Sequence, residues 1–161
     1  MPQTQAGNKV FICTTAQNAD LADAAAFTAL TFVEVKEVGR IGEFGISTNM
    51  VTYNTLATSI AQKGKGVTDL GSPEIECSRN ITDAGQVGMR TAGSPTNQNA
   101  FALKIERSDT PASGASPKPT RHFIRAVVSG PTRPNGGVED FDLEVFTLGI
   151  LQIIDANASA T

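Results

Sequence analysis

Apolar and polar residues alternate with a period of two along several segments of the chain, as they do in strands that bury one face. The clearest examples are the segments 31–38, 73–80 and 101–106. In the first of these, Val33 and Val35 alternate with charged residues. The pattern predicts three half-buried strands, whose opposite faces carry Glu34, Glu74 and Glu76.

The segment 46–53 is a fourth predicted strand, and Gly39, Gly42 and Gly45 before it favour a bend or a bulge. The polar segment 54–66 ends in Lys-Gly-Lys-Gly and predicts a long loop. The glycines do not fit a dinucleotide-binding fingerprint, which requires a helix after the turn. They do not fit a P-loop either, whose lysine precedes Ser or Thr. We therefore interpret them as structural.

The last third of the chain predicts a hairpin of two long strands, 120–130 and 138–153, joined by a turn-forming segment. On the second strand, the apolar residues at 141, 143 and 145 share one face, and the other face carries Asp140, Asp142 and Glu144. Carboxylates at such spacing could bind a cation or act as a catalytic pair. A charged face on a single strand is more often solvated, and we predict that here.

Two short helices are predicted. Asp83 is expected to cap a helix within the segment 82–93, and the alanine-rich segment 20–30 favours one or two helical turns that begin at Asp20. Glycines weaken the first helix, so packing has to stabilise it.

The length of 161 residues corresponds to one domain, and the many glycines and prolines indicate frequent turns in a mainly β protein. We expect an N-terminal arm at 1–20, a single β-sandwich domain at 21–155 and a flexible tail at 156–161. The net charge of −3 argues against tight nucleic-acid binding, which needs clustered Lys and Arg. The loop at 109–120 is rich in proline and is expected on the surface.

The two cysteines, Cys13 and Cys77, are expected to be free and buried, because no secretory signal precedes them. No run of eighteen apolar residues is present, so no membrane anchor is expected. His122 is the sole histidine and alternates with apolar residues on its strand, which favours a partly buried structural position over a catalytic base. We expect neither a catalytic residue nor a metal or cofactor site.

The order of several motifs resembles that of the major tail tube proteins of long-tailed, siphovirus-type (lambda-like) bacteriophages. These motifs are the stretch from AAAFTAL to GEFG, the loop that closes on KGKG, the strand PEIECSRN, and Asp83-Ala84-Gly85-Gln86 at the start of a helix. The resemblance covers most of the chain, although the loop at 109–120 is longer than is usual in that family.

The resemblance implies a tail-tube β-sandwich or barrel with one flanking helix, a long inter-strand loop and an N-terminal arm. It implies hexameric rings that stack into a hollow virion tail, through which genomic DNA passes without specific binding. Tape-measure, tail terminator and distal tail proteins would be the partners, and assembly would take place in the host cytoplasm. It points to Asn54, Lys63 and Lys65 as candidates for ring stacking. Glu34, Glu74 and Glu76 become candidates for the lumen, where carboxylates would repel DNA phosphates.

Three alternative functions remain open from the sequence. One is the tube of a related machine, such as a gene transfer agent, a contractile tail or a type VI secretion system. Another is a capsid decoration protein. The third is a small hydrolase that would depend on His122 or Asp142.

Overall fold

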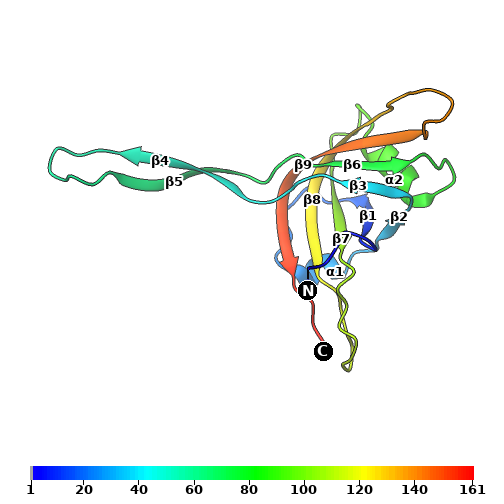
Figure 1. Cartoon of the computed structure of the whole chain (residues 1–161), viewed down its shortest axis with the longest axis horizontal. Coiled ribbons are helices and arrows are strands. Elements are labelled where there is room, and N and C mark those ends of the chain that lie inside the picture. The colour runs from blue at the N-terminus through cyan, green and yellow to red at the C-terminus, as the bar shows by residue number, and fades with distance from the viewer. Residues whose placement is uncertain (1) are drawn as a thin grey trace.

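The computed structural model describes residues 2–161 and is mainly β, as predicted, with a curled sheet of seven antiparallel strands and two short helices (Figure 1). The strands of this sheet follow the order β2-β1-β7-β8-β9-β6-β3, and β4 pairs with β5 in a separate sheet. The elements are β1 (Lys9–Ala16), α1 (Ala24–Thr28), β2 (Val33–Val35), β3 (Val38–Ile41), β4 (Ser47–Tyr53), β5 (Gln62–Asp69), β6 (Glu74–Ser78), α2 (Ala84–Ala92), β7 (Ala100–Glu106), β8 (Arg121–Thr132) and β9 (Leu143–Ala156).

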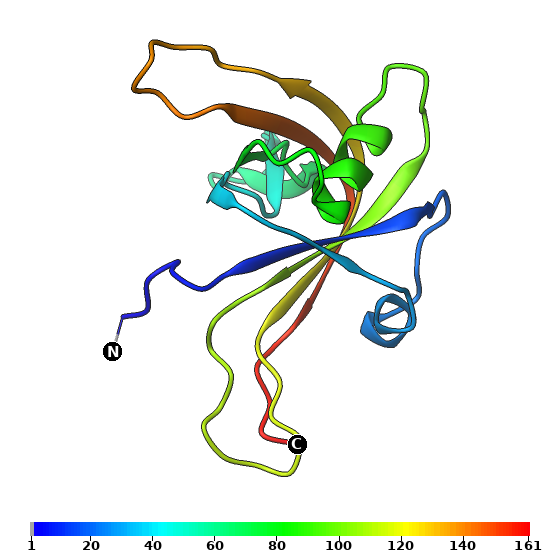
Figure 2. The same cartoon turned by 90° about the vertical axis from the view of Figure 1, so that its right-hand side faces the viewer.

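The run of residues 33–41 closes the curled sheet into a barrel-like shape. Its first part, β2, pairs with β1, and its second part, β3, pairs with β6 at the other end of the strand order. Only Lys36 and Glu37 separate the two parts, and three peptide steps span at most about 11 Å. The two outermost strands therefore lie close together, and the sheet has to curl (Figure 2). The strand predicted at 31–38 is thus divided at Glu37, which has a φ of 61°.

The main hydrophobic core fills the inside of the barrel. Strands from all parts of the curled sheet and α2 contribute buried side chains to it, among them Val10, Val35, Ile75, Met89, Leu103, Ile124 and Phe146. A second, smaller cluster lies on the outer face, where α1 packs against the sheet. There Phe27 stacks on Phe123 with ring centroids 5.4 Å apart. The sheet therefore buries part of both of its faces.

The N-terminal end of helix α2 is hydrogen-bonded both to the closing run 33–41 and to β6. The carboxylate of Asp83, at the N-cap, accepts hydrogen bonds from the backbone N–H groups of Gln86 (3.0 Å) and Lys36 (3.2 Å). The buried amide of Gln86 donates to the carbonyls of Lys36 (2.9 Å) and Ser78 (2.8 Å) and accepts from Asn80 N–H (2.8 Å). These bonds satisfy the hydrogen-bonding groups of the buried amide, and they attach the helix to the closing run at Lys36 and to β6 at Ser78.

Eight residues of the segment 1–20, which was expected to be an N-terminal arm, form a strand of the sheet. Within it, Lys9–Ala16 forms β1, which pairs with β2 on one side and β7 on the other. Val10 and Ile12 are fully buried in the barrel. The apolar residues Val10, Phe11 and Ile12 stand among polar residues, so the local sequence does not predict a strand, but these residues pair with β2 and β7 of the same chain. The division into domains stays a prediction.

The pair β4–β5 forms a hairpin that projects away from the barrel (Figure 1). The predicted strand at 46–53 matches β4, but the loop predicted at 54–66 is too long, because β5 begins at Gln62. All residues of β5 are exposed, and its sequence, QKGKGVTD, has no apolar face. The periodicity that reveals a half-buried strand is therefore missing.

The acidic face predicted for the last strand is wrong at Glu144. β9 begins at Leu143, which leaves Asp140 and Asp142 in the preceding loop. Glu144 points into the barrel on the same face as Phe146 and is fully buried. The apolar residues further along β9 fix which face is buried, because shifting a strand by one residue would expose all of them.

The two ends of the domain also differ in detail from the expectation. α1 begins after Asp23 rather than at Asp20, and the Asp23 carboxylate accepts a hydrogen bond from Ala26 N–H at 2.9 Å. In the C-terminal tail, Ser159 exchanges two backbone hydrogen bonds with Lys118, at 2.7 and 3.0 Å. The tail is therefore attached to the proline-rich loop at that point.

A substitution at Gly85 tests the contact between α2 and β2. A Cβ at this position would lie 2.1 Å from the carbonyl oxygen of Glu34 and 2.6 Å from the Cα of Val35. We expect Gly85→Ala to lower the free energy of unfolding by about 1–3 kcal/mol, because the helix would have to move away from the strand. Urea unfolding measures the loss. Gly39→Ala is the control, since nothing lies within 4 Å of its added Cβ; an equal effect in both variants would contradict the close packing.

Candidate assembly surfaces

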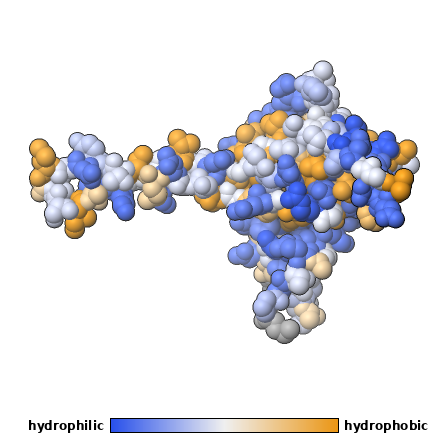
Figure 3. All heavy atoms as spheres, turned by 45° about the horizontal axis from the view of Figure 1, so that its top comes forward, coloured by the Kyte–Doolittle hydropathy of each residue, from blue (hydrophilic) through white to orange (hydrophobic). Residues whose placement is uncertain are grey.

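The projecting hairpin carries seven of the twelve large apolar side chains that are exposed within residues 2–161. Its strands, tip and base carry large apolar side chains that are more than half exposed, namely Ile46, Met50, Val51, Tyr53, Leu56, Ile60 and Val67. Orange and blue residues alternate along it in the space-filling view (Figure 3). Scattered apolar residues are ordinary on a surface, but seven on one two-stranded element form a candidate interaction site.

The predicted ring-stacking residues all lie on this hairpin. Lys63 pairs with Thr52, and Lys65 pairs with Met50, so both lysines are on β5 and not in a loop. Asn54 follows directly after β4, where the chain enters the tip. All three residues are exposed. The structure therefore brings them together on one element, and their role in stacking stays a prediction.

The predicted lumen residues share the outer face of the barrel. Their sequence neighbours Val35, Ile75 and Cys77 point inward and are buried, which turns the three glutamates outward. Glu34 lies on β2, which is the first part of the closing run 33–41, and the other two lie on β6, which pairs with the second part of that run. Glu74 forms an ion pair with Arg40 at 3.3 Å, and both side chains are about half exposed. A role of this face in a bore stays a prediction.

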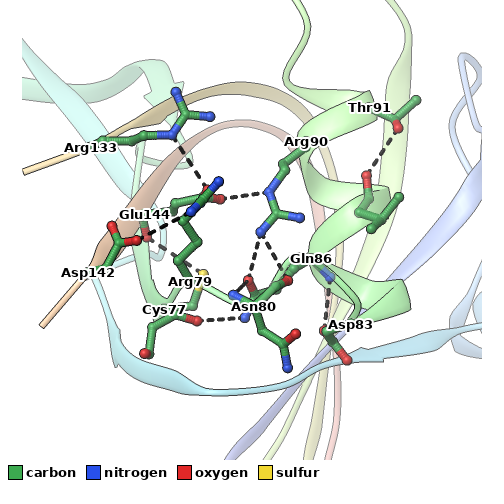
Figure 4. Close-up of polar contacts among 12 residues, drawn as sticks. Cys77, Arg79, Asn80, Asp83, Gln86, Arg90, Thr91, Arg133, Asp142 and Glu144 are labelled. Carbon is green, nitrogen blue, oxygen red and sulfur yellow. Dashed lines mark hydrogen bonds and ion pairs between the residues drawn. The ribbon is translucent and has the colours of Figure 1, made fainter.

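Glu144 is the centre of a cluster of charged side chains inside one end of the barrel (Figure 4). Its Oε2 accepts a hydrogen bond from Nε of Arg90 at 2.9 Å. Its Oε1 accepts no aligned hydrogen bond among the described residues but lies at ion-pair distance from Arg79 (3.3 Å) and Arg133 (3.6 Å). Three guanidinium groups thus compensate the cost of burying one carboxylate.

The cluster also affects Cys77, which lies next to it on β6. Burial raises the pKa of the Cys77 thiol to about 11, and the negative charge of Glu144 adds to this effect. The thiol donates a long hydrogen bond to the Glu144 carbonyl, 3.6 Å away. Cys13 and Cys77 are both free and buried. A thiol with a raised pKa is a poor nucleophile at neutral pH, so this cysteine has a packing role.

His122 lies at the far end of the barrel, on the wall of an open recess of about 630 Å³. Its Nδ1 is 2.6 Å from Oδ1 of Asp155, and Nε of Arg107 donates to its Nε2 at 2.8 Å. The ring nitrogen that a catalytic base would use is therefore occupied. None of the described residues that line the recess carries a hydroxyl or thiol nucleophile. The His–Asp pair therefore lacks the third member of a hydrolytic triad.

Within residues 2–161, no group of three or more His, Cys, Asp or Glu side chains is placed to hold a metal ion. No helix in that range is both long and apolar enough to cross a membrane.

Comparison with known proteins identifies structures that share the fold. No protein-family model and no curated protein matches the chain. The chain is similar to one in the sixfold-symmetrised cryo-EM structure of the anti-feeding prophage (AFP) baseplate, with a TM-score of 0.66 and 7% identity over 98% of this chain and 97% of that one. It is also similar to a chain of the PVC sheath/tube terminator, from an extracellular contractile injection system in the extended state. That match has a TM-score of 0.68 and 10% identity over 97% of each chain. The chain therefore shares its fold with a chain of the AFP baseplate structure and with a chain of the PVC sheath/tube terminator structure.

A substitution at Arg90 tests how much the buried cluster around Glu144 contributes to stability. We expect Arg90→Met to lower the free energy of unfolding by about 2–4 kcal/mol, because it leaves the buried Glu144 with more distant partners only. Adding Glu144→Leu should recover most of this loss, since the uncompensated charge is then removed. Arg40→Met is the control and should cost less than about 1 kcal/mol, because its partner Glu74 is half exposed. Denaturant unfolding of the four proteins provides the measurement. Similar losses for Arg90→Met and Arg40→Met would contradict the role of the cluster.

Proposed function

We propose that this protein is a structural, non-enzymatic subunit that assembles into hexameric rings, which stack to form the hollow tube of a tail-like particle. The observation that carries the proposal is the projecting hairpin with its seven exposed apolar side chains. The machine we favour is a contractile injection system or contractile phage tail, because both structural neighbours come from contractile or baseplate assemblies. Localisation in the particle follows from this function.

An isolated two-stranded hairpin is at best marginally stable in water. The β4–β5 hairpin makes its pairing contacts within itself, and all but one of the residues in its two strands are exposed. Contact with neighbouring copies would bury both of its faces and offset the entropy of ordering it. Ring symmetry supplies such contacts, because each subunit presents the same hairpin to the next one.

The hexameric state is supported by the sixfold symmetry of the AFP baseplate to which the chain is similar. In such a ring the outer barrel face with Glu34, Glu74 and Glu76 lines the bore, and Asn54, Lys63 and Lys65 contact the next ring of the stack. Terminator, tape-measure and baseplate or distal tail proteins are the proposed partners. The bore carries DNA in a phage or another cargo in an injection particle.

The tail tube of a siphovirus-type bacteriophage is the second candidate, and the order of the motifs from AAAFTAL to Asp83-Ala84-Gly85-Gln86 favours it. The two candidates differ in the neighbouring genes, because a contractile machine needs a sheath protein. The physical role of the hairpin is the same in both.

Assembly is tested by electron microscopy and sedimentation of the purified protein over a range of concentrations. We expect rings or rods of uniform width that increase with concentration. Replacing Leu56 and Ile60 with Ser should shift the protein at least tenfold toward monomer, because this removes apolar contact area from the hairpin tip.

Ile81→Ser is the control for that experiment. Ile81 is also well exposed but lies outside the hairpin, so its replacement should leave assembly unchanged. A wild-type protein that remains monomeric at every concentration would overturn the proposed function.

A further inference from the structure

The loop 133–142 between β8 and β9 contains the sole Asn-Gly pair of the chain, Asn135-Gly136 (orange in Figures 1 and 2). All residues of this loop are exposed. Exposed loop tips are the parts of a protein where a local change is resisted least by the fold. Asparagine is one of the thermally labile residue types. Asn135 is therefore a candidate for a reaction with its own backbone.

This reaction joins two atoms of neighbouring residues. The backbone nitrogen of the residue after an asparagine attacks the side-chain carbonyl carbon, Cγ, and closes a five-membered ring. Because both atoms belong to one chain, their effective concentration is high. A Cβ on the following residue crowds this approach, whereas glycine has no Cβ and reaches many more backbone conformations. An asparagine that precedes glycine is therefore more reactive than one that precedes any larger residue.

The fold of the loop requires glycine at position 136. A Cβ there would lie 2.0 Å from Oδ2 of Asp140. The same carboxylate accepts a hydrogen bond from Gly137 N–H at 2.7 Å, and Asp140 N–H donates to the Gly137 carbonyl at 3.2 Å. This turn orders the loop and leaves no room for a side chain at position 136. The reactive sequence is thus a consequence of the turn.

The two reacting groups are not held by other contacts. Among residues 2–161, no hydrogen bond engages the side-chain amide of Asn135 or the backbone N–H of Gly136. The hydrogen bonds of the turn begin one residue later, at Gly137. The amide of Asn135 is therefore free to rotate toward the Gly136 nitrogen without breaking a bond within the fold.

Other asparagines of the chain lack this combination of features. Near the C-terminus, the nitrogen that follows Asn157 belongs to Ala158 and donates a hydrogen bond to Oγ1 of Thr120 at 3.0 Å. Asn54 is exposed on the β4–β5 hairpin, but the β-branched Thr55 follows it and crowds the approach to its side chain. Asn54 is therefore a matched exposed comparison within the same chain.

We propose that Asn135 deamidates spontaneously to aspartate and isoaspartate. The Gly136 nitrogen forms a bond with Cγ of Asn135, the bond between Cγ and Nδ2 breaks, and the side-chain nitrogen leaves as ammonia with the proton of the Gly136 amide. Water then opens the resulting succinimide ring. Its addition at Cγ breaks the new bond and gives aspartate, whereas its addition at the backbone carbonyl of residue 135 gives isoaspartate. One water is consumed and one ammonia is released, so solvent is the only co-reactant.

The product changes the charge of the loop. The loop carries Glu139, Asp140 and Asp142 against Arg133, which forms an ion pair with the buried Glu144 at 3.6 Å. A carboxylate at position 135 adds a further negative charge two residues from that arginine. Isoaspartate also lengthens the backbone, because the chain then runs through Cγ. The modified form accumulates with the age of the protein, and this inference goes beyond the proposed function because it does not depend on assembly.

The first test ages the full-length protein in neutral and in mildly alkaline buffer and maps its proteolytic fragments by mass spectrometry. We expect the mass change of deamidation to be at least tenfold more abundant at Asn135 than at Asn54. It should form faster in the alkaline buffer, because the Gly136 nitrogen has to lose its proton. Equal conversion at Asn135 and Asn54 would overturn the inference.

The second test uses Asn135→Gln, which keeps the amide but would have to close a larger ring. We expect isoelectric focusing to show an acidic form that accumulates in the wild-type protein and falls at least tenfold in this variant. Asn54→Gln is the matched control and should leave the acidic form unchanged. The acidic form should contain isoaspartate, detected by methylation with isoaspartyl methyltransferase. An acidic form that persists in Asn135→Gln, or one without isoaspartate, would contradict the reaction.

Discussion

The closure of the barrel by the run 33–41 is the constraint on which the rest of the structure depends. One short stretch of chain pairs with β1 through its first part and with β6 through its second, so the interior can be filled by a single layer of side chains and one helix. The buried amide of Gln86 completes the closure by bonding to the backbone on both sides of it. The motif Asp83-Ala84-Gly85-Gln86 thus has a physical role at each of its polar or glycine positions: Asp83 caps the helix, Gly85 permits close approach and Gln86 bridges two strands.

The same closure determines which parts of the chain remain uncovered. β3 is the last strand in the order of the sheet and pairs with β6 on one side, and the strands that follow it in the chain do not pair with its other side. The next two strands can pair only with each other, outside the barrel. Helix α2 in turn places Arg90 against Glu144, and this pair holds the start of β9 and the loop before it. The exposed hairpin that we assign to assembly therefore follows directly after the run that closes the barrel.

The sequence predicted the parts of the fold that have one buried face. Strands near β6, β7 and β8, the cap at Asp83 and the mainly β class all follow from local patterns that the tertiary structure reinforces. β1 was missed because its apolar patch is short, and β5 because none of its residues is buried within the chain. Glu144 was placed on the wrong face, since alternation in a short window cannot tell which of two faces a longer strand buries. Its arginine partners come from distant segments, so no local pattern could have revealed the buried cluster.

The charge of the outer barrel face has a consequence for any bore that this face would line. Glu74 is already paired with Arg40, so much of its field is neutralised locally, whereas Glu34 and Glu76 form no ion pair within residues 2–161. In a ring, the symmetry would repeat these two carboxylates around the opening, and their fields would add close to the wall, within about one Debye length, roughly 8–10 Å. Like charges at such spacing raise the local potential and keep an anionic cargo away from the wall. The same wall would attract a cationic cargo, so the identity of what the tube transports is linked to whether these two residues, rather than Glu74, face the bore.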